Sequence, residues 1–164
     1  MDVFATIRQQ YEFNRGRTLG LLEQIEEHPQ PAVALGWRPH PERAHIGWQL
    51  MHIGVSEEIF ATERLAPDKE PQMQQWWERF RGGSTPDDNP PSPDEIRQVL
   101  DAGRGAYLAT LGQFSIDQLD EIVYVHPAGN RELSLLTVMN ILNWHEAHHQ
   151  GQAHITWNQY KAQV

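Results

Sequence analysis

The positions of the prolines limit what this chain can fold into more than any other feature. They fall at positions 29, 31, 39 and 41, within residues 66–93, and at position 127. A helix does not continue through such positions, because proline removes a backbone donor and its ring clashes with the preceding turn. In the stretches left between them, apolar residues recur mostly at steps of three and four, the period of an amphipathic helix. We predict long helices over residues 3–25, 43–65, 93–111 and 134–160.

The third of these helices has a clear start signal. Ser92 is followed by Pro93, Asp94 and Glu95, which supply a capping hydroxyl, a proline at the first helical position and acids at the positive end of the helix dipole. The preceding residues 66–92 are rich in Pro, Gly, Asp and Ser around the sequence QMQQWWERF. They predict a long connection that contains one short helix.

A shorter pattern lies between the third and fourth long helices. Ser115 and Gln118 form a capping-box pattern, and the following EIVYVHPAGNRE predicts two short strands joined by a turn. Four long helices without an internal repeat favour an all-α class, namely an antiparallel four-helix bundle with a long crossover connection. A length of 164 residues fits one such domain, over residues 1–164.

Composition and charge exclude several classes of function. A net charge of -9 without a Lys/Arg cluster disfavours nucleic-acid binding, because a phosphate backbone would be repelled on average. The absence of cysteine excludes disulfides and thiolate ligands, so any metal site must use His, Asp or Glu. No apolar stretch is long enough to span a bilayer, and no signal peptide is recognisable. We therefore expect a soluble cytoplasmic protein.

The nine histidines include one pair with the spacing of metal ligands. His145 and His149 are four residues apart, so that on a helix their side chains lie close enough to share one ion. Both continue a stripe of residues at alternating steps of three and four that should face the interior of the bundle. That stripe consists of Leu135, Val138, Leu142, His145, His149, Gln152 and Thr156.

A third ligand must come from another helix. His52 is the best candidate because its surroundings in the second helix are otherwise apolar, and His45 is the reserve candidate. The alternative is that these are hydrogen-bonded core histidines without a metal. His148 is turned about 100° away from the adjacent His149 and is expected either at the bundle edge or in a role that supports the ligands.

Two segments resemble a known family. The resemblance is to the DinB/YfiT-like superfamily. It rests on the segment HIGWQLMHIGVSEEIF, which contains His52, on the segment NWHEAHHQGQ, which contains His145 and His149, and on the W-x-P connector at 37–39. The resemblance implies a four-helix bundle in which these three histidines bind a divalent metal, usually nickel or zinc. It also implies frequent homodimers, with activities that include thiol-dependent transfer or isomerisation and, in other members, hydrolysis.

These observations lead to two competing functional hypotheses. In the first, the metal activates a low-molecular-weight thiol or a water molecule toward a small-molecule substrate. Glu57, Glu58 and Glu146 are interpreted as solvated or supporting acids, with Glu146 along the bundle edge, and no general base is assigned. Gln152 either orients a bound water or substrate or bonds a neighbouring group. In the second hypothesis the bundle binds a metal, a ligand or a partner without catalysis.

Overall fold

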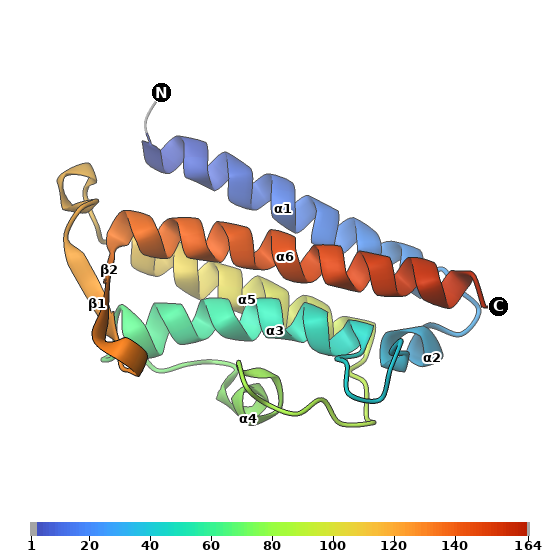
Figure 1. The fold of residues 1–164 in the computed structure, drawn as a ribbon. Helices are drawn as coiled ribbons and strands as arrows, with labels where there is room; N and C mark the ends of the chain where they lie inside the picture. The colour runs from blue at the N-terminus through green and yellow to red at the C-terminus, as the bar shows by residue number, and fades with distance from the viewer. Residues whose placement is uncertain (1–2, 164) are drawn as a thin grey trace.

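The computed structural model describes residues 3–163 and shows a mostly helical chain with one small hairpin (Figure 1). Its four long helices lie alongside one another. They are α1 (Val3–Glu26), α3 (Ile46–Ile59), α5 (Pro93–Leu111) and α6 (Leu135–Lys161). None of the described helices combines the length and the apolar character needed to cross a membrane. The four predicted long helices are confirmed.

The helix boundaries follow the caps in the sequence. Ser92 accepts a hydrogen bond from Glu95 N, Glu95 bonds back to Ser92 N, and Pro93 occupies the first turn of α5. Ser134 caps α6 by accepting from Thr137 N. Such caps satisfy backbone donors that have no partner inside the helix.

The second long helix departs from its predicted bounds. It begins at Ile46 rather than at residue 43, and its last turn is a π-helical segment, η1 (Phe60–Arg64). Every residue of α3 is buried, as its apolar circumference predicts. Neighbouring segments cover it on several sides, since α3 contacts α5, α6, α2 and α4.

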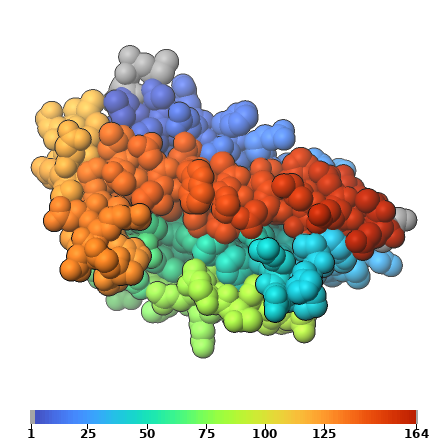
Figure 2. Space-filling view, in the orientation of Figure 1, coloured from blue at the N-terminus to red at the C-terminus, as the bar shows by residue number. Residues whose placement is uncertain are grey.

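The connections contain short elements. The proline-rich segment after α1 forms α2 (Pro31–Gly36), which was not predicted and which begins at a proline in the N-terminal turn. The connection between α3 and α5 carries η2 (Gln74–Trp76) and α4 (Trp77–Phe80), as predicted, and lies along α3 (Figure 2).

The two predicted strands are confirmed as well. After the short helix η3 (Ile116–Gln118), β1 (Ile122–His126) pairs antiparallel with β2 (Arg131–Ser134) across the turn η4 (Ala128–Asn130). The hairpin lies at the end of the helices where α6 begins (Figure 1).

Two apolar clusters fill the interior, one towards each end of the long helices. The cluster at the hairpin end includes Tyr11 of α1 and Leu142 of α6, whereas Ile25 of α1 and Trp157 of α6 belong to the other cluster. On α5 the order is reversed, because Leu100 precedes Tyr107 along the chain but lies in the far cluster. Helices α1 and α6 therefore run in one direction, and α5 runs in the opposite one.

A close backbone approach joins α3 to α5. A Cβ atom at Gly54 would lie 2.5 Å from the Val99 carbonyl oxygen, and a Cβ at Gly103 would overlap with the Gly54 carbonyl oxygen. Only glycine leaves room for backbones this close. The two glycines thereby set the spacing between α5 and α3, the helix that carries His52.

Candidate metal centre

Three histidines from α3 and α6 lie together. One side-chain nitrogen from each of His52, His145 and His149 falls within 4.8 Å of the other two. The Nε2 atoms of His52 and His145 are 3.1 Å apart. This is close to the roughly 3.3 Å between two nitrogens that share a tetrahedral ion at bond lengths of about 2.0–2.1 Å. The donor set fits a late divalent transition metal.

His52 is held by its neighbours in a tautomer suited to metal binding. Its Nδ1 lies 2.6 Å from the Phe80 carbonyl oxygen, which can only accept, so Nδ1 carries the proton. The ring stacks on Trp48 with centroids 4.6 Å apart. Consequently the Nε2 lone pair of His52 points toward His145, with the other ring nitrogen engaged in the way typical of metal-bound histidines.

His149 is oriented in the same way by an amide. Its Nδ1 is 2.5 Å from Gln49 Oε1, and the Gln49 amide is itself fixed because its Nε2 donates to Gln152 Oε1 at 3.1 Å. Nδ1 of His149 is therefore the donor, and Nε2 keeps its lone pair. Gln152 supports this arrangement from one turn further along α6, and it also contacts His148 Nε2 at 2.5 Å.

Burial keeps all three rings neutral. It lowers the pKa of His145 to about 2 and that of His149 to about 3, and in both cases neighbouring histidines lower the pKa further. The pKa of His52 is lowered by burial as well, against the opposing effect of the Phe80 carbonyl. Neutral imidazole is the form that binds a metal, so at neutral pH no proton has to be displaced.

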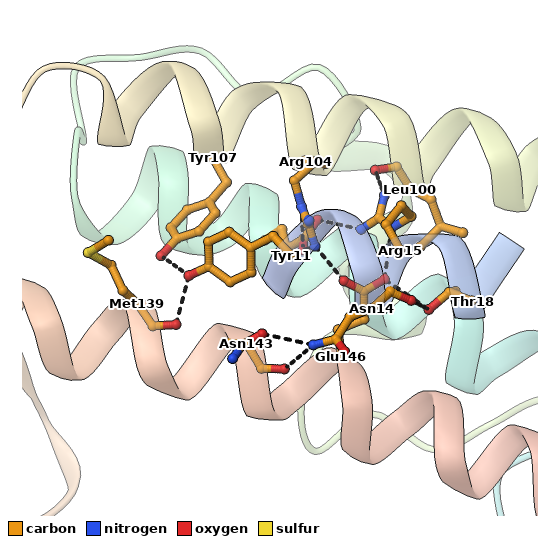
Figure 3. A network of polar contacts seen from close by, with 11 residues as sticks. Tyr11, Asn14, Arg15, Thr18, Leu100, Arg104, Tyr107, Met139, Asn143 and Glu146 are labelled. Atoms are coloured by element: carbon orange, nitrogen blue, oxygen red, sulfur yellow. Dashed lines mark hydrogen bonds and ion pairs between the residues drawn. The ribbon is translucent and has the colours of Figure 1, made fainter. Parts of the chain in front are cut away.

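A closed ring of buried ion pairs includes Glu146, the residue that follows His145, and each long helix supplies one member of the ring (Figure 3). Arg15 of α1 donates to Glu57 of α3 and to Glu146 of α6, both at 2.8 Å. Arg104 of α5 contacts the same two glutamates. Burial alone would lower the pKa of Arg104, but the two carboxylates outweigh it and raise that pKa. The ring pairs two guanidinium groups with two carboxylates, so its formal charges balance.

The buried ring corrects the interpretation of the acidic residues. Glu146 was expected along the bundle edge and Glu57 as a solvated or supporting acid, yet they are 0% and 1% exposed and bond to arginines. Glu58, also 1% exposed, accepts from Gln72 N, Met73 N and the Trp77 indole in the connection. None of the three is free to act as a general base.

The remaining histidines lie outside the cluster. The reserve candidate His45 caps α3, with its Nδ1 accepting from Trp48 N at 3.0 Å. His148 is exposed at the edge, as predicted, and stacks on Trp144. His28 packs against Trp157 and Tyr160.

Two separate cavities reach different members of the histidine cluster. The larger, of about 490 Å³, is lined by His149, Gln49, Trp48 and Gln152 among others. The smaller, of about 270 Å³, is lined by His52 and His145 together with the hairpin and the α3–α5 connection. Small molecules can therefore reach the histidines from two directions.

Known proteins share both the sequence pattern and the fold. The sequence model of the DinB superfamily matches residues 10–153, a range that includes all three histidines. A conserved protein from Enterococcus faecalis, solved as a crystal structure, is similar with a TM-score of 0.67 and 16% identity over 96% of each chain. At that identity the likeness concerns the fold alone. No curated protein matches the chain.

Proposed function

The chain belongs to the DinB superfamily, and from that premise we propose that His52, His145 and His149 bind one divalent transition-metal ion, zinc or nickel, in the service of catalysis. The observation that carries the proposal is the neutral form and the orientation of the three imidazole rings. Three neutral imidazoles converge, and in His52 and His149 the nitrogen remote from the cluster is already used as a donor. Three protein ligands are also the number typical of catalytic rather than structural zinc sites.

We propose thiol transfer as the reaction, ahead of hydrolysis. An ion in this site supplies Lewis acidity, which lowers the pKa of a thiol or a water molecule and produces a nucleophile near neutral pH. A hydrolase would usually position a carboxylate as general base. Glu57, Glu58 and Glu146, the acids nearest the histidines along α3 and α6, are all committed to buried bonds. A free thiol has a pKa of about 8.5 against about 15.7 for water, so it depends less on a base for its deprotonation, and the residues present suit thiol chemistry better.

The two cavities support a reaction between two small molecules. Each of them touches part of the histidine cluster, one at His149 and the other at His52 and His145. A thiol in one cavity and an electrophile in the other would meet at the cluster. Holding two reactants in this way replaces a bimolecular encounter by a positioned one.

The family resemblance also leads us to propose how the helices are arranged and how the chain assembles. The four long helices are proposed to form the predicted four-helix bundle with a crossover between α3 and α5, in which α1 and α6 are parallel to each other and antiparallel to α5, acting as one domain over residues 1–164. We further propose a cytoplasmic homodimer. Light scattering of the purified protein tests the dimer, and a monomeric mass would contradict it.

Metal content and turnover test the proposed function together. Untagged wild-type protein is expected to contain zinc or nickel at close to one equivalent by elemental analysis. It should also consume mixtures of a low-molecular-weight thiol and an electrophile. His149→Ala should lose both properties, whereas His40→Ala, which removes an exposed histidine outside the cluster, should keep both.

Each other outcome has a defined meaning. If His149→Ala retains the metal, the ligand assignment is wrong. If the metal is lost without loss of any activity, the chain is a binding module rather than an enzyme, which was the competing hypothesis.

A further inference from the structure

The smaller of the two cavities beside the histidines is strongly basic. Arg64, Arg81 and Arg131 line it, and no Asp or Glu is among its lining residues. The arginines come from three separate segments, η1, the connection that follows α4, and β2. The cavity also touches His52 and His145 directly. Three cations therefore gather at one entrance to the cluster in a chain whose net charge is -9.

Aromatic rings hold the Arg64 side chain in place, but no carboxylate pairs with its charge in the described residues. Its guanidinium lies 4.1 Å from the centroid of the Phe60 ring and 5.2 Å from that of Tyr124. Within residues 3–163 it makes no ion pair, and its Nε is buried without a hydrogen-bond partner. The aromatic faces hold the charge by cation–π contact. They leave its hydrogen-bonding capacity unused.

The two other arginines are also largely unpaired. Arg131 has no carboxylate within ion-pair distance in the described part of the chain. Arg81 has only a weak contact with Glu63 at 3.8 Å, with both side chains about half exposed. By contrast, the arginines of the buried ring, Arg15 and Arg104, each contact two carboxylates. The chain thus neutralises the arginines of its interior and leaves those of this cavity available.

We propose that this basic cavity binds the anionic group, carboxylate or phosphate, of a small substrate whose reactive atom lies at the histidine cluster. Guanidinium groups match the planar, bidentate geometry of carboxylates and phosphates. In a chain that otherwise repels anions, a local positive surface also selects and concentrates them. A volume of about 270 Å³ suits a compact acid. The inference deepens the proposed function and rests on it only for the role of the histidines.

Anion binding to metal-free protein tests the proposal separately from metal chemistry. Calorimetric titration of chelator-treated protein at low salt uses malonate, inorganic phosphate and, as the uncharged control, malonamide. Malonate, phosphate or both are expected to bind, and malonamide is not. The anion that binds more tightly identifies the carboxylate or phosphate source. Added salt should weaken the binding, because it screens exposed charges.

Variants locate the binding in this cavity. Arg131→Gln and Arg81→Gln change exposed side chains and should fold normally, and each is expected to raise the Kd about tenfold, the effect of losing one charge-assisted hydrogen bond. Arg43→Gln, which removes a charge from the cavity beside His149, serves as the matched control and should leave the Kd unchanged.

The outcomes separate this inference from the proposed function. Binding that is unaffected by Arg131→Gln and Arg81→Gln, equally weakened by Arg43→Gln, or shown equally by malonamide overturns the basic-cavity proposal. His149→Ala protein, tested without metal, should bind malonate as the wild type does. If His149→Ala retains its metal, the proposed function fails while anion binding in this cavity still stands.

Discussion

The buried ring of ion pairs makes a quantitative prediction about stability. Glu146 is 0% exposed and accepts hydrogen bonds from Arg15 Nε at 2.8 Å, from Thr18 Oγ1 at 2.9 Å and from Arg104. Glu146→Gln keeps the size of the side chain but leaves two buried cations facing one anion. We therefore expect a large loss in the free energy of unfolding.

The magnitude follows from the contacts that are lost and kept. Removing one partner of a buried ion pair costs about 3–5 kcal/mol. The glutamine oxygen still accepts from Arg15 and Thr18, and each retained bond is worth about 1 kcal/mol or less. The expected loss thus lies near 3 kcal/mol, a large part of the roughly 5–15 kcal/mol that stabilises a typical domain.

Urea unfolding followed by tryptophan fluorescence measures this loss, with a chelator present so that metal binding does not contribute. Glu63→Gln is the matched control, because Glu63 meets Arg81 at 3.8 Å and is about half exposed. It should cost less than about 0.5 kcal/mol. The double variant Glu146→Gln/Arg104→Met restores neutrality and should be more stable than Glu146→Gln alone. Equal losses for the two glutamate variants would refute the reasoning.

Two further predictions concern α5 and the cap of α3. Gly103→Ala should destabilise the protein by about 2–3 kcal/mol, because the added Cβ would overlap with the backbone of α3. Gly105→Ala is the control: its Cβ would meet nothing within 4 Å, so the change should be neutral or stabilising by up to about 1 kcal/mol. Urea unfolding of the two variants measures the difference. Burial lowers the pKa of His45 from 6.5 to about 4. Between pH 6.5 and pH 4 the unfolded chain therefore binds a proton at His45 that the folded chain does not bind, and the free energy of unfolding falls as the pH drops. His45→Asn keeps a capping side chain and should remove up to about 1.4 kcal/mol per pH unit of this dependence, measured by unfolding at pH 7 and pH 5; an unchanged slope would exclude His45 as its source.

Local signals in the sequence were sufficient for most of the helical architecture. The Ser92 cap and the proline-free segment after Ser134 gave the ends of α5 and α6 to within a residue or two. The three-and-four stripe placed His145 and His149 on the face of α6 that meets His52. These features depend on residues close together along the chain, which is why periodicity and capping chemistry could predict them.

Features that depend on several helices at once were not predictable in this way. Glu146 was interpreted as an edge residue because it directly follows His145 and so lies off the stripe that faces the interior. Its partners Arg15 and Arg104 come from α1 and α5 and could not be inferred from α6 alone. Gln49 was overlooked although it precedes His52 by one turn, because its role appears only when α6 brings His149 to it. The residue types were visible in each case, but the contacts required tertiary structure.

The arrangement of the core bears on whether a metal would be structural or functional here. In small metal-dependent domains the ion supplies the folding free energy, because little else holds the chain together. In this chain two apolar clusters and a balanced ring of ion pairs already join all four long helices. Along α6, His145 and His149 fall between Leu142 of one cluster and Ala153 of the other, and cavities open onto the histidines rather than a closed shell of protein. An accessible site in a fold that other contacts already join supports the proposal of a functional rather than a structural metal.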